Sequence, residues 1–467
     1  MEQLNDIENY IDSTKQIFKD HELLFQLPII NFLHLKNYNL LQQDWLKLTV
    51  SDAIIEGKEL QESEFIDRLI DSVANGTIYV SPFNTNFIIL IGFPIFQPEY
   101  PSTLANLIQS CHASSLQSWY KKEEHKDRYQ QQNFVNKIRK KYLTKMNPKK
   151  IHEVGLMSQL IGDICKKNEI NSMVDIGSGQ GYLTRLTSYE NKIEVIGLDG
   201  DSRQTIGAKK IDEQYKKWDN IQTEHFTLII NQENYEEFHE LVGKQINEKP
   251  FLISGLHTCG YLAYSILDLF LKSNANALVS VPCCYNKLLP SLNGCFEPRS
   301  KFLQKKEFKI DRLGLKMACQ SPFNWSQNKR NCYEFFKRHF YRAMLQELIY
   351  TEGYKNENEE IESIGKMSML EYANFSIYCH SSFKRLKLAP LPTEEVIQSY
   401  YLKNLKYYNT IALLWSCQAL LAPLIESVLL LDRYLILQEE GCEVDLIPLF
   451  DLLVSPRAFA LVATKKK

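Results

Sequence analysis

Short apolar runs alternate with longer mixed segments through the middle of the chain. The segments 181–190 and 202–218 combine polar and apolar positions as helices do. The apolar runs have the length of strands, and they lie at 172–177, 193–200, 226–230, 251–256 and 277–282. Apolar strands that alternate with helices are typical of a parallel sheet covered on both faces. The pattern therefore predicts a doubly wound α/β core.

The regions on either side of this core have a different pattern. Residues 1–120 mix helical segments with extended ones, such as 87–96, and residues 300–440 are mostly helical. The segment 121–150 is almost entirely polar, which indicates a domain boundary. The last apolar run, 458–464, is expected to join the sheet. We therefore predict an N-terminal mixed accessory region at 1–135, the core at 136–300, a largely helical C-terminal insertion at 301–445, and a final strand region at 446–467.

The most apolar stretch, 411–431, is long enough to cross a bilayer. However, Pro423 and Glu426 interrupt it, and Asp432 and Arg433 follow it at once. A charged residue inside a membrane span is costly. We therefore expect two packed helical stretches in a buried core, and no membrane insertion.

Composition adds little to this picture. Hydrophobic residues make up 44% and charged residues 24% of the chain, and the formal net charge is −2, as in ordinary soluble proteins. Global charge therefore excludes a general attraction to nucleic acid or membrane, and only local patches can provide one. The 11 cysteines show no regular spacing, and the acidic first residues lack the apolar core of a signal peptide. We expect reduced thiols and an intracellular location, in the cytoplasm or the nucleus.

The stretch DIGSGQGYLT, residues 175–184, carries the first sign of chemistry. Gly177, Gly179 and Gly181 follow a predicted strand and precede a predicted helix. Glycine suits a turn where backbone approaches a ligand closely, because no Cβ intrudes. Asp199 ends the next predicted strand, where a carboxylate lies beside the ribose of a bound nucleotide-like ligand. A tight turn without a ligand is the alternative.

The spacing of the glycines favours one ligand over another. Dinucleotide folds prefer G-x-G-x-x-G, whereas here Asp175 precedes G-x-G-x-G, the form seen in S-adenosylmethionine-dependent methyltransferases. This methyl donor has an ammonium and a sulfonium in place of a pyrophosphate, so acceptors such as Asp175 and the turn carbonyls suit it. We predict S-adenosylmethionine as the cofactor. Asn231, after the third strand, would contact the adenine, although a polar strand cap explains it equally well.

A histidine and three cysteines follow the fourth and fifth predicted strands. These residues are His257, Cys259, Cys283 and Cys284. The carboxyl ends of parallel strands share one edge of the sheet with the glycine turn, so the four side chains are expected to meet there. They would form the floor of a methyl-transfer site with His257 as base or orienter of the acceptor, bind zinc, or pack as small buried residues. Because the spacing is not a usual zinc pattern, no metal is expected.

A basic stretch leads into the core. Residues 137–150 carry seven Lys or Arg side chains, including Lys149 and Lys150. Such a cluster contacts phosphate groups in nucleic-acid-binding proteins. A solvated helix face, or a cap for the carboxylate of the donor, is the alternative.

Together these features resemble the methyltransferase-like protein 25 family, including its branch named for resemblance to ribosomal RNA adenine dimethylases. The resemblance extends over more than half of the chain. Its motifs are MNPKKIHEV (146–154), VDIGSGQGYLTR (174–185), LHTCG (256–260), CCY (283–285), and the two segments 420–439 and 449–465. The His-x-Cys-Gly and Cys-Cys pairing is also similar to that of eukaryotic tRNA 2′-O-methyltransferases.

The resemblance implies a Rossmann-like class I methyltransferase fold. It implies that Asp175 and the glycines of the turn, with Asp199, contact the cofactor, and that His257 and the cysteines face the acceptor. We expect methyl transfer to an O or N atom of a macromolecule, with RNA preferred, protein as the alternative acceptor, and a degenerate binding protein as the alternative to an enzyme. The last alternative arises because Tyr261 stands where the family has an aspartate, and a tyrosine with a pKa near 10 does not replace a carboxylate.

Overall fold

The fold was obtained as a computed structural model. It describes residues 2–50, 63–78, 100–116, 138–231, 234–246, 249–288 and 294–466. The chain forms two compact units, each built from two separate segments. Unit 1 contains residues 1–114 and 322–421, and unit 2 contains residues 115–321 and 422–467. Unit 1 therefore combines parts of the predicted accessory region with parts of the predicted helical insertion.

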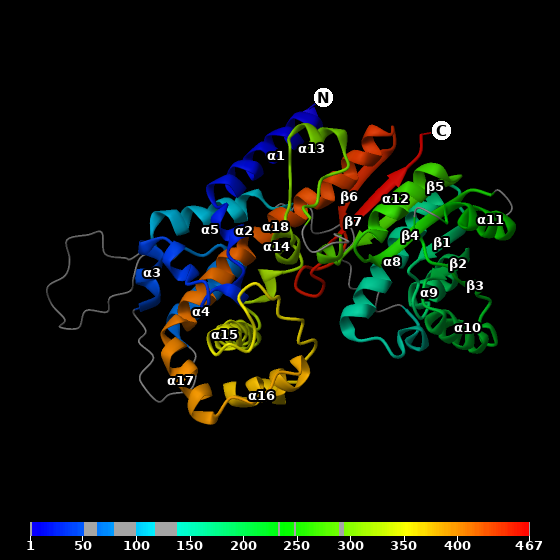
Figure 1. Cartoon of the computed structure of the whole chain (residues 1–467). Coiled ribbons are helices and arrows are strands. Elements are labelled where there is room, and N and C mark those ends of the chain that lie inside the picture. Colours follow the sequence, from blue (N-terminus) through cyan, green and yellow to red (C-terminus); the bar gives the residue numbers. More distant parts are fainter. Residues whose placement is uncertain are drawn as a thin grey trace, which may run out of the picture. The chain divides into compact units, whose positions relative to one another are not determined.

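Unit 2 contains a seven-stranded sheet with the order β3-β2-β1-β4-β5-β7-β6 (Figure 1). Strands β1 to β5 are parallel to one another, and β7 runs antiparallel to both β5 and β6. The strand order reverses at β1, and in such sheets the crevice at this switch point binds ligands. The strands are β1 (Ser172–Ile176), β2 (Glu194–Asp199), β3 (Gln222–Thr227), β4 (Phe251–Thr258), β5 (Ala275–Pro282), β6 (Glu443–Pro448) and β7 (Phe459–Thr464).

Helices cover both faces of this sheet. Met173 and Leu252 share a buried cluster with side chains of two helices. The residues that follow them in each strand, Val174 and Ile253, are equally buried. Alternate residues of each strand point to opposite faces, so both faces are covered. The helices of unit 2 are α8 (Pro148–Lys167), α9 (Tyr182–Asn191), α10 (Ser202–Lys216), α11 (Tyr235–Ile246), α12 (Leu262–Lys272), α13 (Lys301–Lys305) and α14 (Arg312–Met317). The predicted α/β fold is confirmed, and so is the pairing of the last strand with the sheet.

Two details at the edges of the sheet differ from prediction. The third strand is 222–227 rather than 226–230, and β6 was not predicted. Both are edge strands with many exposed or half-buried positions. Because an edge strand is covered on fewer sides than a central one, it needs no continuous apolar run. The apolar run after Thr227 instead leaves the sheet, and Ile229 is 62% exposed.

The longest helix corrects a second prediction. The apolar stretch forms one continuous helix, α18 (Tyr408–Glu439), instead of two helical stretches. Pro423 lies inside it, and proline removes one backbone hydrogen bond from a helix. The Ser427 hydroxyl donates to the carbonyl of Pro423 at 2.7 Å, and burial of the apolar side chains stabilises the helix through the proline. This part of the chain is long and apolar enough to cross a membrane, but its most apolar window is 100% buried within the protein, as in core helices.

Unit 1 consists of helices among its described residues. They are α1 (Glu2–Asp20), α2 (Leu23–Gln26), α3 (Gln43–Val50), α4 (Glu64–Asn75), α5 (Ser102–Ser114), α15 (Lys329–Thr351), α16 (Phe375–Leu386) and α17 (Glu394–Asn404), with the first part of α18. The predicted extended segment 87–96 lies outside the described residues. Helices α13 to α18, which are divided between the two units, confirm the largely helical nature of 300–440.

Candidate functional site

The glycine turn between β1 and α9 forms what we call the donor side of the site. Gly177, Gly179 and Gly181 have φ angles of 75°, 54° and 69°, in the left-handed region that favours glycine. The backbone N–H groups of Gly177 and Ser178 donate to the carbonyl of Leu198 at 2.8 and 3.0 Å. The turn is thus fixed to the end of β2, the neighbouring strand.

The glycines serve different purposes. A Cβ at Gly179 would have no atom within 4 Å, so the space beside this residue is open to a ligand. A Cβ at Gly181 would lie 2.7 Å from Cε1 of His225 and 2.9 Å from Nη1 of Arg185. Gly179 therefore leaves space on the ligand side, whereas Gly181 allows the turn to pack on the core.

Asp199 lies at the end of β2, beside the turn. Its Oδ2 accepts a hydrogen bond from the N–H of Gly179 at 2.8 Å, and its Oδ1 accepts one from the N–H of Asp201 at 2.9 Å. The residue is partly exposed. Each carboxylate oxygen has a second lone pair, so the oriented carboxylate is able to accept hydroxyl groups of a ribose.

Asp175 has a more enclosed position than predicted. Its side chain is buried, and its Oδ2 accepts a hydrogen bond from the Thr184 hydroxyl at 2.8 Å. Burial raises the pKa of this carboxyl to about 6, although the bond from Thr184 and the charge of His225 act in the opposite direction. Asp175 therefore supports the turn from below, and its contact with the donor ammonium stays a prediction.

A buried polar cluster, which no pattern in the sequence predicted, supports the donor side. Asp212 of α10 accepts hydrogen bonds from Arg185 at 2.8 Å and from Thr223, and Nε2 of His225 lies 2.9 Å from its Oδ2. Burial alone would raise the pKa of Asp212, but these partners hold it below its usual value. The cluster fixes the ring that lies against Gly181.

The ends of β4 and β5 form what we call the acceptor side. His257 lies at a bulge of β4 and has a φ of 63°, which is unusual for a residue other than glycine. Its Nε2 lies 2.9 Å from Oε2 of the buried Glu153 of α8, whose Oε1 accepts a hydrogen bond from Ser455 at 2.6 Å. Burial alone would raise the pKa of Glu153, but these bonds and the charges of His257 and Lys149 lower it. An ionised carboxylate only accepts, so Nε2 is the ring nitrogen that donates to Glu153, and in the neutral imidazole Nδ1 is the nitrogen able to accept a proton.

Of the four residues predicted to meet on the acceptor side, the three cysteines are in contact with one another. The Sγ of Cys259 lies 3.3 Å from that of Cys283 and 3.1 Å from that of Cys284, and the latter two are 3.5 Å apart. All three are partly buried free thiols. The hydrogen bond from Cys283 lowers the pKa of Cys259 to about 5, and the same bond raises that of Cys283. The contact between these two thiols therefore favours ionisation of Cys259 over ionisation of Cys283.

A second buried network, which sequence reasoning missed, holds the loop after β5. Glu426 of α18 accepts hydrogen bonds from the Tyr285 hydroxyl at 3.0 Å and from Arg457 at 2.9 Å. The three side chains are buried. The charge that interrupts the apolar stretch in the sequence is therefore paired, and it anchors the residue after Cys284.

The remaining predicted site residues lie at the surface. Asn231 is four residues beyond the end of β3, where it exchanges hydrogen bonds of 3.0 and 3.1 Å between side chain and backbone with Asn234. Lys149 and Lys150 are exposed in the first turn of α8. The ammonium group of Lys149 lies 3.7 Å from Glu153, and that of Lys150 lies 4.4 Å from the centre of the Tyr182 ring.

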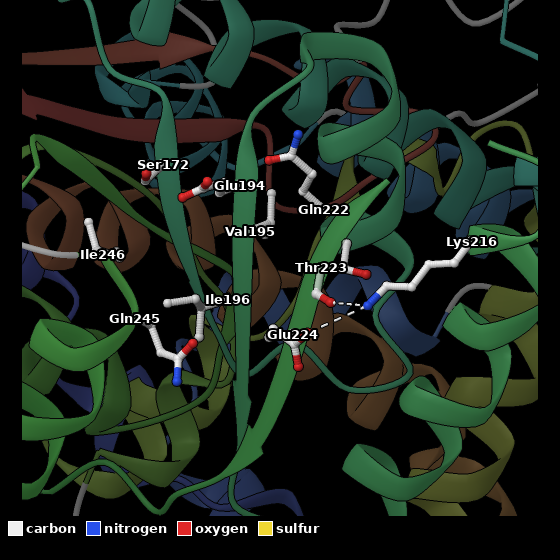
Figure 2. A pocket seen from close by; sticks show the side chains of 10 residues that line it. All are labelled: Ser172, Glu194, Val195, Ile196, Lys216, Gln222, Thr223, Glu224, Gln245 and Ile246. Carbon is white, nitrogen blue, oxygen red and sulfur yellow. Dashed lines mark hydrogen bonds and ion pairs between the residues drawn. The ribbon is translucent and has the colours of Figure 1, made fainter. Parts of the chain in front are cut away.

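A pocket of about 270 Å³ opens at the opposite edge of the sheet (Figure 2). Ser172, Glu194 and Gln222, the first residues of β1, β2 and β3, line it, and Lys216 reaches the carbonyl of Thr223 at 2.7 Å. Ligands of such sheets bind at the carboxyl ends of the strands. The pocket is therefore distinct from the donor side.

Comparison with known proteins agrees with this picture. Residues 149–291 match the model of a family described as a methyltransferase domain. The chain is 24% identical to the human protein named probable methyltransferase-like protein 25, over 69% of this chain and 75% of the relative. The mouse protein of the same name is 23% identical over 69% of this chain and 76% of its own length. These matches confirm the predicted resemblance and the predicted methyltransferase domain.

Two solved structures are also similar, but only slightly. The plantazolicin methyltransferase BpumL in complex with SAH is 16% identical, with a TM-score of 0.22 over 39% of this chain and 60% of that chain. The plantazolicin methyltransferase BamL in complex with a triazolic desmethylPZN analog and SAH has the same identity and TM-score, over 63% of this chain and 88% of that chain. Likenesses of this size carry no argument about the site.

Proposed function

We propose that the chain is an S-adenosylmethionine-dependent methyltransferase that acts on an O or N atom of a macromolecule, with RNA as the preferred acceptor. The observation that carries the proposal is the donor side. Open space beside Gly179 adjoins the carboxylate of Asp199, which the turn itself orients through a hydrogen bond of 2.8 Å. The donor would lie there, with its ribose on Asp199, its adenine toward Asn231 and its ammonium near Asp175 and the turn carbonyls.

The reaction would take place between the donor side and the acceptor side. Strands β1 and β4 are neighbours, so their carboxyl ends, with Gly177 and His257, share one edge of the sheet. When bound, the donor would supply a methyl group to the acceptor atom in line with its bond to sulfur, and S-adenosylhomocysteine, which keeps the electron pair of that bond on sulfur, would leave. Nδ1 of His257 takes the proton of the acceptor, and Glu153 stabilises the imidazolium that forms.

Exposed lysines support an RNA acceptor. Arg139 and Lys141 are engaged with Asp219, at 3.1 Å for the arginine. Lys149 and Lys150 are exposed at the start of α8, four and three residues before Glu153. They are thus near the acceptor side, where they would contact phosphate groups next to the reacting nucleotide. A protein acceptor is the second candidate.

Calorimetric titration with S-adenosylmethionine tests the donor site. We expect saturable binding by the natural chain, and at least tenfold weaker binding by Asp199→Ala because the ribose loses its acceptor, roughly 1.4 kcal/mol. A matched control is Asp201→Ala, which removes a neighbouring, partly exposed carboxylate that caps α10. Absence of heat with the folded natural chain would overturn the proposal.

Transfer of a labelled methyl group to total cellular RNA or total protein tests the acceptor. We expect label in RNA, and loss of label with Glu153→Gln although donor binding persists. Lys149→Ala/Lys150→Ala should weaken RNA binding. If both lysines contact single-stranded phosphate, the variant should also reduce the slope of the logarithm of the binding constant against the logarithm of the salt concentration by about 1.4. The control Lys166→Ala/Lys167→Ala changes two exposed lysines at the other end of α8. Label found in protein alone would replace RNA by the second candidate.

A further inference from the structure

The three thiols of Cys259, Cys283 and Cys284 form a compact triangle that the proposed methyl transfer does not require. The sulfur–sulfur distances are 3.1, 3.3 and 3.5 Å. A tetrahedral zinc ion with zinc–sulfur bonds of about 2.3 Å holds its thiolates about 3.8 Å apart. Moving each sulfur outward by a few tenths of an ångström therefore makes room for the ion. We propose that these cysteines bind one zinc ion, with the fourth coordination position open to water or another external ligand.

The fold overcomes the objection raised by the sequence spacing. Adjacent cysteines alone chelate poorly, but Cys259 reaches the pair from a different strand end. The two loops approach closely at Gly260, where a Cβ would lie 2.6 Å from the carbonyl of Lys287. Gly260 also has a φ of 59°. The glycine thus permits the approach that brings the third thiol to the pair.

The cluster is also held in place before any ion arrives. The N–H of Cys283 donates to the carbonyl of Thr258 at 3.4 Å, which connects β5 to β4 just before the thiols. Tyr285 is fixed by Glu426 on the other side of the pair. A site whose ligands are fixed by the surrounding structure loses little conformational freedom on binding. This arrangement favours a metal site over flexible surface thiols.

The surroundings supply positive charge for thiolates. Cys259 lies between the end of β4 and the start of α12 at Leu262, and Lys287 follows Cys283 and Cys284 in the chain. Thiolates are stabilised by helix N-termini and by nearby lysines, and zinc binds thiolates after their protons leave. Among the described residues, the metal-ligating group contains the three cysteines without a further His, Asp or Glu. Three protein ligands and one open position are typical of zinc sites that take an external ligand.

A disulfide is the main alternative chemistry for close thiols. It would join two of the three sulfurs at about 2.05 Å and leave the third alone. The triangle, in contrast, has similar distances on all three sides and no bonded pair. Reduced thiols that converge on one point suit a thiophilic cation of the zinc type.

Elemental analysis of the full chain, purified without chelator after expression with added zinc, tests the proposal. We expect about one zinc ion per chain. Cys283→Ser/Cys284→Ser should lose it, whereas Cys295→Ser, which changes an exposed cysteine outside the cluster, should keep it. Circular dichroism checks that each variant is folded. Neither measurement needs donor or acceptor, so failure here is distinct from failure of the proposed methyl transfer.

Cobalt(II) substitution provides a second measurement that does not depend on variants. A three-thiolate site should show intense sulfur-to-cobalt charge-transfer absorption and the strong visible bands of four-coordinate cobalt. Three outcomes would overturn the proposal: a folded natural chain without stoichiometric zinc, zinc retained by Cys283→Ser/Cys284→Ser, or a disulfide within the cluster found by mass spectrometry of the alkylated protein.

Discussion

The donor side and the acceptor side lie at neighbouring strand ends, but they are stabilised in different ways. The donor side is a continuous stretch of chain whose glycines and backbone hydrogen bonds fix its shape, as between Gly179 and Asp199. The acceptor side depends on side chains from distant parts of the sequence. His257 is held by Glu153, which precedes the sheet, and the loop at Tyr285 is held by Glu426, which comes near the end of the chain.

The difference shows what each side tolerates. A backbone-built turn fails when a side chain is added to it, because Cβ atoms occupy the space of a ligand or of the core. A site built by distant side chains fails when one partner of a pair is removed, because the charge of the other partner is then buried without compensation. Variants on the two sides of the site should therefore differ in their effects on stability and on donor binding.

Glu426→Ala should be the most destabilising single change on the acceptor side. It leaves the guanidinium of Arg457 and the Tyr285 hydroxyl buried without their acceptor, which costs about 3–5 kcal/mol for a broken buried ion pair. Urea unfolding measures this loss. The double variant Glu426→Leu/Arg457→Met should recover most of it, because no unpaired charge remains. Equal stability of Glu426→Ala and the natural chain would show that the network does not hold the loop.

On the donor side, Asp175→Asn should gain stability relative to the natural chain as the pH rises, whereas Glu426→Ala loses stability. The folded-state pKa of Asp175, about 6, lies above its ordinary value of 3.8, so the folded protein binds this proton more tightly than the unfolded chain. The contribution of Asp175 to the free energy of unfolding is therefore greatest below about pH 4. It decreases as the pH rises to 6, by about 3 kcal/mol for a pKa shift of two units.

The variant lacks this titration. Urea unfolding between pH 4 and pH 7 should thus show Asp175→Asn gaining stability relative to the natural chain as the pH rises, while its affinity for the donor does not increase. The same pH dependence in both proteins would mean that Asp175 does not carry the shift.

Much of the donor side was predictable from sequence, and the reason is local. A glycine pattern after an apolar strand specifies a turn through backbone conformation alone, and Gly177, Gly179 and Gly181 all have the positive φ that this requires. The parallel core was predictable for a similar reason, because central strands buried on both faces read as apolar runs. The edge strands β3 and β6 were not, because they need no such run.

The acceptor side was only partly predictable. Strand order places His257 and the cysteines at one edge, and this much followed from the sequence. The partners did not, since Glu153 in α8 and His257 in β4 are separated by six strand or helix elements, and Arg457 lies far beyond both. Long-range pairs of single side chains leave no periodic pattern in a sequence. Asp212 and His225, which support Gly181, escaped notice for the same reason.

Alanine at two glycines separates ligand space from core packing. Gly181→Ala should destabilise the protein by about 2–3 kcal/mol, because its Cβ meets the fixed ring of His225 and its φ of 69° is strained for alanine. Gly179→Ala should cost only about 1 kcal/mol, since its Cβ meets no atom within 4 Å. Its effect should appear instead in calorimetry, as weaker donor binding. Similar unfolding curves for both variants would contradict this division of roles.

Tyr261→Asp should have the smallest effect on stability. It introduces the aspartate that the family resemblance leads us to expect at this position. Tyr261 is 42% exposed at the N-terminal end of α12, where an aspartate interacts favourably with the helix dipole, by about 0.3–1 kcal/mol. A rise of a few degrees at most in the unfolding temperature is therefore expected.

Methyl transfer should change little in the same variant, because Nε2 of His257 already has a carboxylate partner, the Oε2 of Glu153 at 2.9 Å. Labelled-methyl assays of the natural chain, Tyr261→Asp and Tyr261→Asn decide the matter, since asparagine has the same size as aspartate without its charge. If label is transferred by Tyr261→Asp alone, then the acceptor side needs a second carboxylate, and this chain is a degenerate enzyme whose intact donor side is retained for binding. If the natural chain transfers label as well, the aspartate of the family acts on helix α12 rather than on the acceptor.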